Sequence, residues 1–65
     1  MYNMEKLKQL RKENKYTIYD MAHKLGITAS YYSQIENKKK KLYYDMAYKI
    51  ALIFNMKPDS IFIQK

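Results

Sequence analysis

Residues 17–39 read TIYDMAHKLGITASYYSQIENKK, and this stretch decides how the rest of the chain is interpreted. Thr17 and Asp20 have the spacing of a capping box, in which each side chain satisfies a backbone N–H of the other residue at a helix start. Gly26 can adopt the positive φ that commonly ends a helix. Thr28 is a suitable N-cap for a second helix that begins directly afterwards. Two short helices joined by a tight turn are therefore predicted here.

The remaining sequence extends the same helical pattern in both directions. Apolar residues recur at helical intervals, and a single Gly and a single Pro leave little room for the many turns of an all-β fold. Five helices are predicted, over about 4–14, 18–25, 28–37, 43–54 and a short last one that begins at Pro58. Asn3 is the expected N-cap of the first helix. The fold class is therefore predicted to be all-α.

The inward faces of these helices define the expected core. The residues concerned are Leu7, Leu10, Met21, Leu25, Ile27, Tyr32, Ile35, Met46, Ala47, Ile50, Ala51, Phe54, Ile61 and Phe62. Ala22 lies four residues before Gly26, where the second and third helices are expected to cross, and its small side chain lets their backbones approach closely.

Length and residue types exclude several classes of protein. Sixty-five residues are expected to form one domain, 1–65. The absence of cysteine excludes disulfides and thiolate zinc sites, and His23 alone makes neither a metal site nor a catalytic triad. We therefore expect no enzyme, no cofactor, no metal and no small-molecule ligand. No segment has the apolar length of a membrane span or of a signal peptide, so a cytoplasmic location without membrane contact is expected.

The charge of the chain points towards a polyanion. Thirteen basic residues stand against six acidic ones, and the formal net charge is +7. Nucleic acid is the commonest partner of a small domain with this excess, although a well-solvated surface would explain the same charge.

The helix predicted after Thr28 has two different sides. Tyr32 and Ile35 face inward, while Ala29, Ser30, Ser33 and Gln34 form a small and polar outer side. A helix that is held against a rigid neighbour in this way can enter the major groove of DNA, which is about 12 Å wide.

These residues resemble the helix-turn-helix of the Cro/CI-type repressors, which are also called the XRE family. The matching positions are Thr17, Met21, Ala22, Leu25, Gly26, Ile27, Ile35 and Glu36, followed by Lys49-Ile50-Ala51 and Pro58-Asp59-Ser60-Ile61-Phe62. The resemblance covers nearly the whole chain. It implies a compact five-helix, lambda-repressor-like DNA-binding domain, with the helix-turn-helix over about 17–37.

The resemblance also implies a role in DNA binding for individual residues. Base edges would be contacted by Ala29, Ser30, Ser33 and Gln34, with Gln34 suited to adenine. Phosphates would be contacted by Thr17, Thr28, Tyr31, Asn37, Lys38, Lys39, Lys40, Lys41, Tyr43 and Tyr44, the last two through the amides that begin the fourth helix.

The resemblance further implies an ion pair between Arg11 and Glu36, which suits the only arginine of the chain because arginine binds carboxylates bidentately. The sequence departs from the family pattern at three positions. Ile18 replaces the usual Gln at the start of the second helix, Tyr32 replaces an aliphatic residue, and Lys38 replaces the usual Gly after the Glu-Asn pair.

Most of the eight tyrosines are expected in core or half-buried positions, because no sheet is predicted that would display them for stacking on single strands. Tyr44, Tyr48 and Leu52 are exceptions, since their spacing of four residues gives the fourth helix a second apolar stripe. A homodimer interface at Tyr48, Leu52 and Ile63 is one interpretation. Packing of the stripe against the first helix or the C-terminal tail is the other.

The resemblance predicts a sequence-specific regulator of transcription that binds double-stranded DNA, with a repressor of the phage, plasmid or mobile-element type favoured. Such a repressor would bind an inverted repeat as a dimer. An antitoxin or a restriction–modification controller could use the same fold. A protein–protein adaptor that has lost DNA binding is the alternative from another class.

Overall fold

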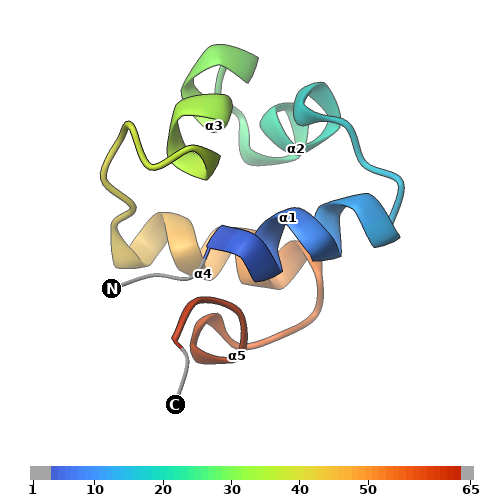
Figure 1. The fold of residues 1–65 in the computed structure, drawn as a ribbon, viewed down its shortest axis with the longest axis vertical. Helices are drawn as coiled ribbons and strands as arrows, with labels where there is room; N and C mark the ends of the chain where they lie inside the picture. The colour runs from blue at the N-terminus through green and yellow to red at the C-terminus, as the bar shows by residue number, and fades with distance from the viewer. Residues whose placement is uncertain (1–3, 64–65) are drawn as a thin grey trace.

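The computed structural model describes residues 4–63, and its five helices follow the predicted order (Figure 1). They are α1 (Met4–Glu13), α2 (Ile18–Leu25), α3 (Ala29–Glu36), α4 (Tyr44–Ile53) and α5 (Pro58–Phe62). No strand occurs within residues 4–63, so the predicted all-α class is confirmed. The observed helix ends lie within about one residue of the predicted ones. Asn3, the expected cap of α1, lies outside the described residues.

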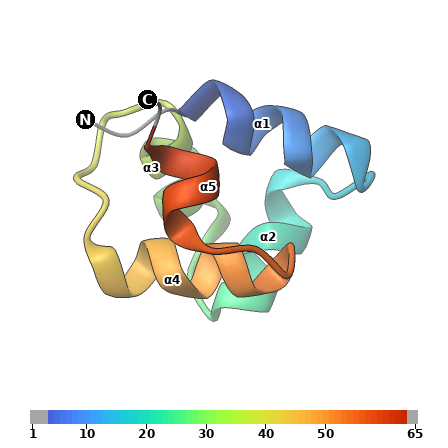
Figure 2. The same ribbon diagram turned by 90° about the horizontal axis from the view of Figure 1, so that it is seen from below.

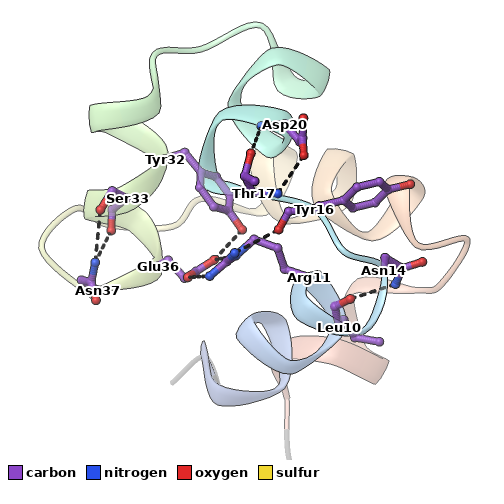
Figure 3. A network of polar contacts seen from close by, with 10 residues as sticks. All are labelled: Leu10, Arg11, Asn14, Tyr16, Thr17, Asp20, Tyr32, Ser33, Glu36 and Asn37. Atoms are coloured by element: carbon purple, nitrogen blue, oxygen red, sulfur yellow. Dashed lines mark hydrogen bonds and ion pairs between the residues drawn. The ribbon is translucent and has the colours of Figure 1, made fainter.

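The start and the end of α2 have the local geometry that the sequence predicts. Thr17 Oγ1 accepts a hydrogen bond from the Asp20 amide at 3.0 Å, and Asp20 Oδ2 accepts one from the Thr17 amide at 2.8 Å (Figure 3). The bond from the Thr17 amide also lowers the pKa of the Asp20 carboxyl. Gly26 ends the helix with φ 71°, and the Ile27 amide donates to the Ala22 carbonyl at 3.0 Å. These short-range bonds fix the turn between α2 and α3.

The helices lie in layers around one core. In Figure 1, α2 and α3 lie at the top, α1 and α4 run beneath them, and α5 lies lowest. Figure 2 shows α5 lying over the space between α1 and α4, and α5 packs against both of these helices. The fully buried large side chains are Leu7, Met21, Tyr32, Ile35, Ile50, Ile61 and Phe62. Ala22, 3% exposed, lies in α2, which packs closely against α3.

The expectation that most tyrosines lie in core or half-buried positions is wrong, although Tyr44 and Tyr48 were expected as exceptions to it. Tyr2 lies outside the described residues. Tyr32 is buried and Tyr16 is half-buried, with its ring centroid 6.2 Å from that of Phe54. The other tyrosines within residues 4–63 are exposed, namely Tyr19, Tyr31, Tyr43, Tyr44 and Tyr48. The core is filled mainly by aliphatic side chains, Tyr32 and Phe62, and these five rings remain at the surface.

No helix in the described part of the chain is long and apolar enough to cross a membrane.

Candidate nucleic-acid interface

Helix α3 presents a polar side to solvent because its apolar side is held in the core. Tyr32 and Ile35 are 0% and 1% exposed, and they anchor the helix against its neighbours. On the opposite side, polar side chains line a shallow depression of about 500 Å³, namely Ser30, Ser33, Gln34, Asn37 and Lys39. This depression lies along the helix that follows the α2–α3 turn.

Two side chains at this depression keep their hydrogen-bonding groups available. Within residues 4–63, neither the Ser30 hydroxyl nor the Gln34 amide has a side-chain hydrogen bond to another residue. Ser30 is exposed and Gln34 is half-buried, so the base of the Gln34 side chain is supported by neighbouring atoms. An amide with both a donor and an acceptor available can recognise a base edge in two places at once.

The other end of the depression is already ordered by hydrogen bonds within α3. Asn37 Nδ2 donates to the Ser33 carbonyl at 2.8 Å and to Ser33 Oγ at 3.3 Å (Figure 3). The bond to a carbonyl identifies this atom as the amide nitrogen, because a carbonyl oxygen can only accept. The Asn37 side chain is therefore held by hydrogen bonds, whereas the Gln34 side chain makes none within residues 4–63.

The basic loop after α3 is tied to the end of that helix. The Gln34 carbonyl accepts hydrogen bonds from the amides of Lys39 and Lys40 at 2.7 and 3.2 Å. Lys38 has φ 63°, a left-handed conformation that favours glycine, and glycine is the usual residue here in the family that the sequence resembles. The side chains of Lys38–Lys41 are exposed, and none forms an ion pair with another described residue. The loop thus carries four exposed lysines directly after α3, and Lys39 among them lines the depression.

The beginning of α4, which follows the lysine loop, has backbone amides without a partner within residues 4–63. Tyr43 is the N-cap residue in extended conformation, and its side chain makes no capping hydrogen bond. Asp45 Oδ1 accepts from the Met46 amide at 2.9 Å, which leaves the amides of Tyr44 and Asp45 without a partner among the described residues. Amides at a helix start attract anionic oxygens, because they combine unpaired donors with the positive end of the helix dipole.

A buried polar network fixes α3 to the rest of the molecule. Arg11 Nε and Nη2 donate to the two carboxylate oxygens of Glu36, each at 2.9 Å, and Arg11 Nη1 donates to the Tyr16 carbonyl at 3.0 Å (Figure 3). The Tyr32 hydroxyl donates to Glu36 Oε2 at 2.8 Å. The side chains of Arg11 and Glu36 are 12% and 3% exposed. The network therefore joins α1, the segment before α2, and both turns of α3.

Protonation in this network follows from the same contacts. The hydrogen bond to Glu36 raises the pKa of the Arg11 guanidinium above its ordinary value. Burial, followed by the hydrogen bond to Glu36, raises the pKa of the Tyr32 phenol well above its usual range. The phenol consequently keeps the proton that it donates to the carboxylate.

Residues 4–65 match the family model of a helix-turn-helix domain. The chain belongs to this family. The match is consistent with the resemblance to the XRE family, and it supports DNA binding as the activity of the chain. No curated protein and no solved structure matches the sequence.

The helix-turn-helix protein brings five of the predicted contact residues to one region of the structure. Ser30, Ser33, Gln34, Asn37 and Lys39 share one depression. The Ala29 side chain is less exposed than expected, because it is half-buried and packs against the core. Thr17 and Thr28 are exposed, and each hydroxyl accepts a backbone hydrogen bond while its own proton stays available.

Two contributions to this interface were missed at the level of sequence. Tyr32 was expected only as a core residue, yet its hydroxyl is the third donor to the buried Glu36 carboxylate. The four-residue spacing of Tyr32 and Glu36 on one helix was the available signal. Leu42 was not expected in the core, but it is 6% exposed and anchors the end of the lysine loop. A single apolar residue after four lysines gives no periodic signal.

Proposed function

We propose that this helix-turn-helix protein is a sequence-specific transcriptional regulator that binds double-stranded DNA through the outer side of α3. The observation that carries the proposal is the pair Ser30 and Gln34, whose side chains make no hydrogen bond within residues 4–63, followed by a loop whose four lysines form no ion pair there. The lysines supply affinity for phosphates, and the hydroxyl and amide supply contacts to base edges. Thr17, Thr28, Tyr31 and the amides at the start of α4 are proposed as further phosphate contacts.

We further propose that the regulator is a repressor that acts in the cytoplasm by occluding a promoter, with residues 1–65 forming one DNA-binding domain. Two copies would bind an inverted repeat whose half-sites lie about one helical turn, ~34 Å, apart. An antitoxin or a restriction–modification controller would use the same contacts. A protein–protein adaptor would not need them, so a test of base reading separates it from the three DNA-binding roles.

The test is selection of bound sequences from random duplex DNA by the unmodified protein and by Gln34→Ala. The unmodified protein is expected to select an inverted repeat. Gln34→Ala is expected to lose the preference at one base pair of each half-site, at a cost of about 1–3 kcal/mol in discrimination, because a bidentate contact is removed.

Gln9→Ala is the matched control, because Gln9 is an exposed glutamine of α1 that bonds to Glu13 at 3.0 Å, away from the α3 depression. Its selected site should equal that of the unmodified protein. If no sequence is enriched, the adaptor role gains support. If Gln34→Ala selects the same site with the same strength, Gln34 does not read DNA, although the protein still binds DNA sequence-specifically.

A further inference from the structure

Helix α4 carries an apolar stripe that no described part of the chain covers. Tyr44, Tyr48 and Leu52 are 62%, 49% and 57% exposed. Packing of this stripe within residues 4–63, one of the two interpretations of the sequence, is therefore wrong. Because the three residues are spaced by four, they form a ridge of the kind that packs against another helix. Ile63 is also exposed, at 48%, but it does not line the groove described next.

A groove of about 440 Å³ lies beside the far end of this stripe. Leu25, Leu52 and Ile53 supply its apolar surface, and Lys24 and Lys49 supply its charge. Neither lysine forms an ion pair with another described residue; the Lys24 ammonium lies 4.7 Å from the centroid of the Tyr16 ring. The groove therefore suits an apolar side chain that is carried next to an acidic one.

The other end of α4 provides this combination. Tyr44 is the most exposed residue of the stripe, and Asp45 follows it as an exposed carboxylate. Tyr44 precedes Leu52 by eight residues, or about 12 Å along the helix, with Tyr48 midway between them. In an antiparallel pair of α4 helices related by a two-fold axis at Tyr48, each Tyr44 lies level with the partner's Leu52.

The same arrangement pairs the charges. Asp45 and Lys49 project from the same flank of the stripe, one turn apart. A two-fold axis at Tyr48 brings Asp45 of each copy beside the partner's Lys49, twice in one interface. If the two helices ran parallel in register, Asp45 of one copy and Lys49 of the other would lie on opposite flanks of the interface and could not pair, so the charges favour the antiparallel orientation.

We propose that the groove formed by Leu25, Leu52 and Ile53 receives Tyr44 of a second copy of this chain, and that α4 pairs with the partner's α4 in antiparallel orientation. This interface would join the two copies that the proposed function requires, and the inference rests on the proposed function to that extent. The interface buries the Tyr44 side chain and leaves the Tyr44 backbone amide available for a phosphate. Two of the three residues expected at a dimer interface, Tyr48 and Leu52, take part.

Charge reversal tests the pairing. Sedimentation equilibrium without DNA should give a monomer–dimer equilibrium for the unmodified protein. Asp45→Lys and Lys49→Asp should each raise the dimer dissociation constant about tenfold or more, since two pairs are lost and like charges meet. The double variant should return to within about threefold of the unmodified value, because the pairs re-form with their signs exchanged.

Asp59→Lys and Lys57→Asp are the matched controls, because both residues are exposed at the start of α5 and neither lines the groove. They change the net charge by the same amounts and should leave the dissociation constant unchanged. A protein that is monomeric up to about 1 mM, or reversals that weaken the dimer without rescue by the double variant, would overturn the proposal. Binding of an acidic peptide by a monomeric protein would identify a different occupant.

Cross-linking gives a second measurement that does not depend on charge. The natural chain has no cysteine, so Tyr48→Cys places a single thiol at the proposed two-fold axis. It should form a disulfide-linked dimer faster than Tyr19→Cys, whose parent side chain is 76% exposed on α2. Equal rates would contradict the two-fold axis at Tyr48. DNA selection by a protein that fails these tests would still support DNA binding, so the two proposals can fail separately.

Discussion

Arg11→Ala is expected to lower the free energy of unfolding by about 3–5 kcal/mol, because it leaves the Glu36 carboxylate buried with a single remaining donor, the Tyr32 hydroxyl. A chain of 65 residues has little stability in reserve. The variant should therefore be largely unfolded at 25 °C. Urea unfolding followed by circular dichroism measures the loss.

Replacing the whole network by apolar residues shows whether the stability loss of Arg11→Ala comes from an unpaired buried charge or from lost packing. A triple variant with Arg11→Met, Tyr32→Phe and Glu36→Leu removes every polar member except the Tyr16 carbonyl. It should be considerably more stable than Arg11→Ala, since a buried network can often be exchanged for apolar residues at small cost. If Arg11→Ala costs less than about 1 kcal/mol, the network does not hold α3 in place.

Replacing Lys38–Lys41 by glutamine is expected to weaken binding to all DNA sequences by a similar factor. Each lost phosphate contact reduces the slope of log affinity against log salt by about 0.9, so four contacts reduce it by about 3 to 4. Fluorescence anisotropy at several salt concentrations measures this slope. The preferred sequence should stay the same, because phosphate contacts carry little sequence information.

The control variant replaces four other lysines by glutamine, namely Lys8, Lys12, Lys15 and Lys57. Its net charge falls by the same amount, from +7 to +3. If both variants lose affinity and slope to the same extent, the loop acts only through net charge and does not contact phosphates. A slope that is flat even for the unmodified protein would exclude the assigned phosphate contacts altogether.

The parts of this fold that could be predicted from sequence depend on short-range chemistry. Thr17, Asp20, Gly26 and Thr28 act within about four residues of their own positions, so their types alone predict the start and end of α2 and the start of α3. The inward face of α4, with the buried residues Ala47, Ile50 and Ala51, was predicted from its helical periodicity.

The parts that could not be predicted depend on how the helices meet. Burial of a tyrosine depends on the space around it: Tyr32 is buried as expected, whereas Tyr19 and Tyr43 lie at the surface although most tyrosines were expected to be buried or half-buried. The half-buried position of Ala29 likewise follows from the angle at which α3 packs. The periodic pattern of apolar residues predicts which side of a helix faces the core, but it does not predict how deeply each side chain is buried.

The most direct test of DNA reading by α3 is an NMR titration of the isotope-labelled protein with duplex DNA carrying its selected site. The account predicts that the largest amide shift changes occur at Ser30, Gln34, the Lys38–Lys41 loop and the first residues of α4, while the exposed residues of α1 and α5 change little. Changes confined to other surfaces, with the amides of α3 unaffected at saturating DNA, would contradict it.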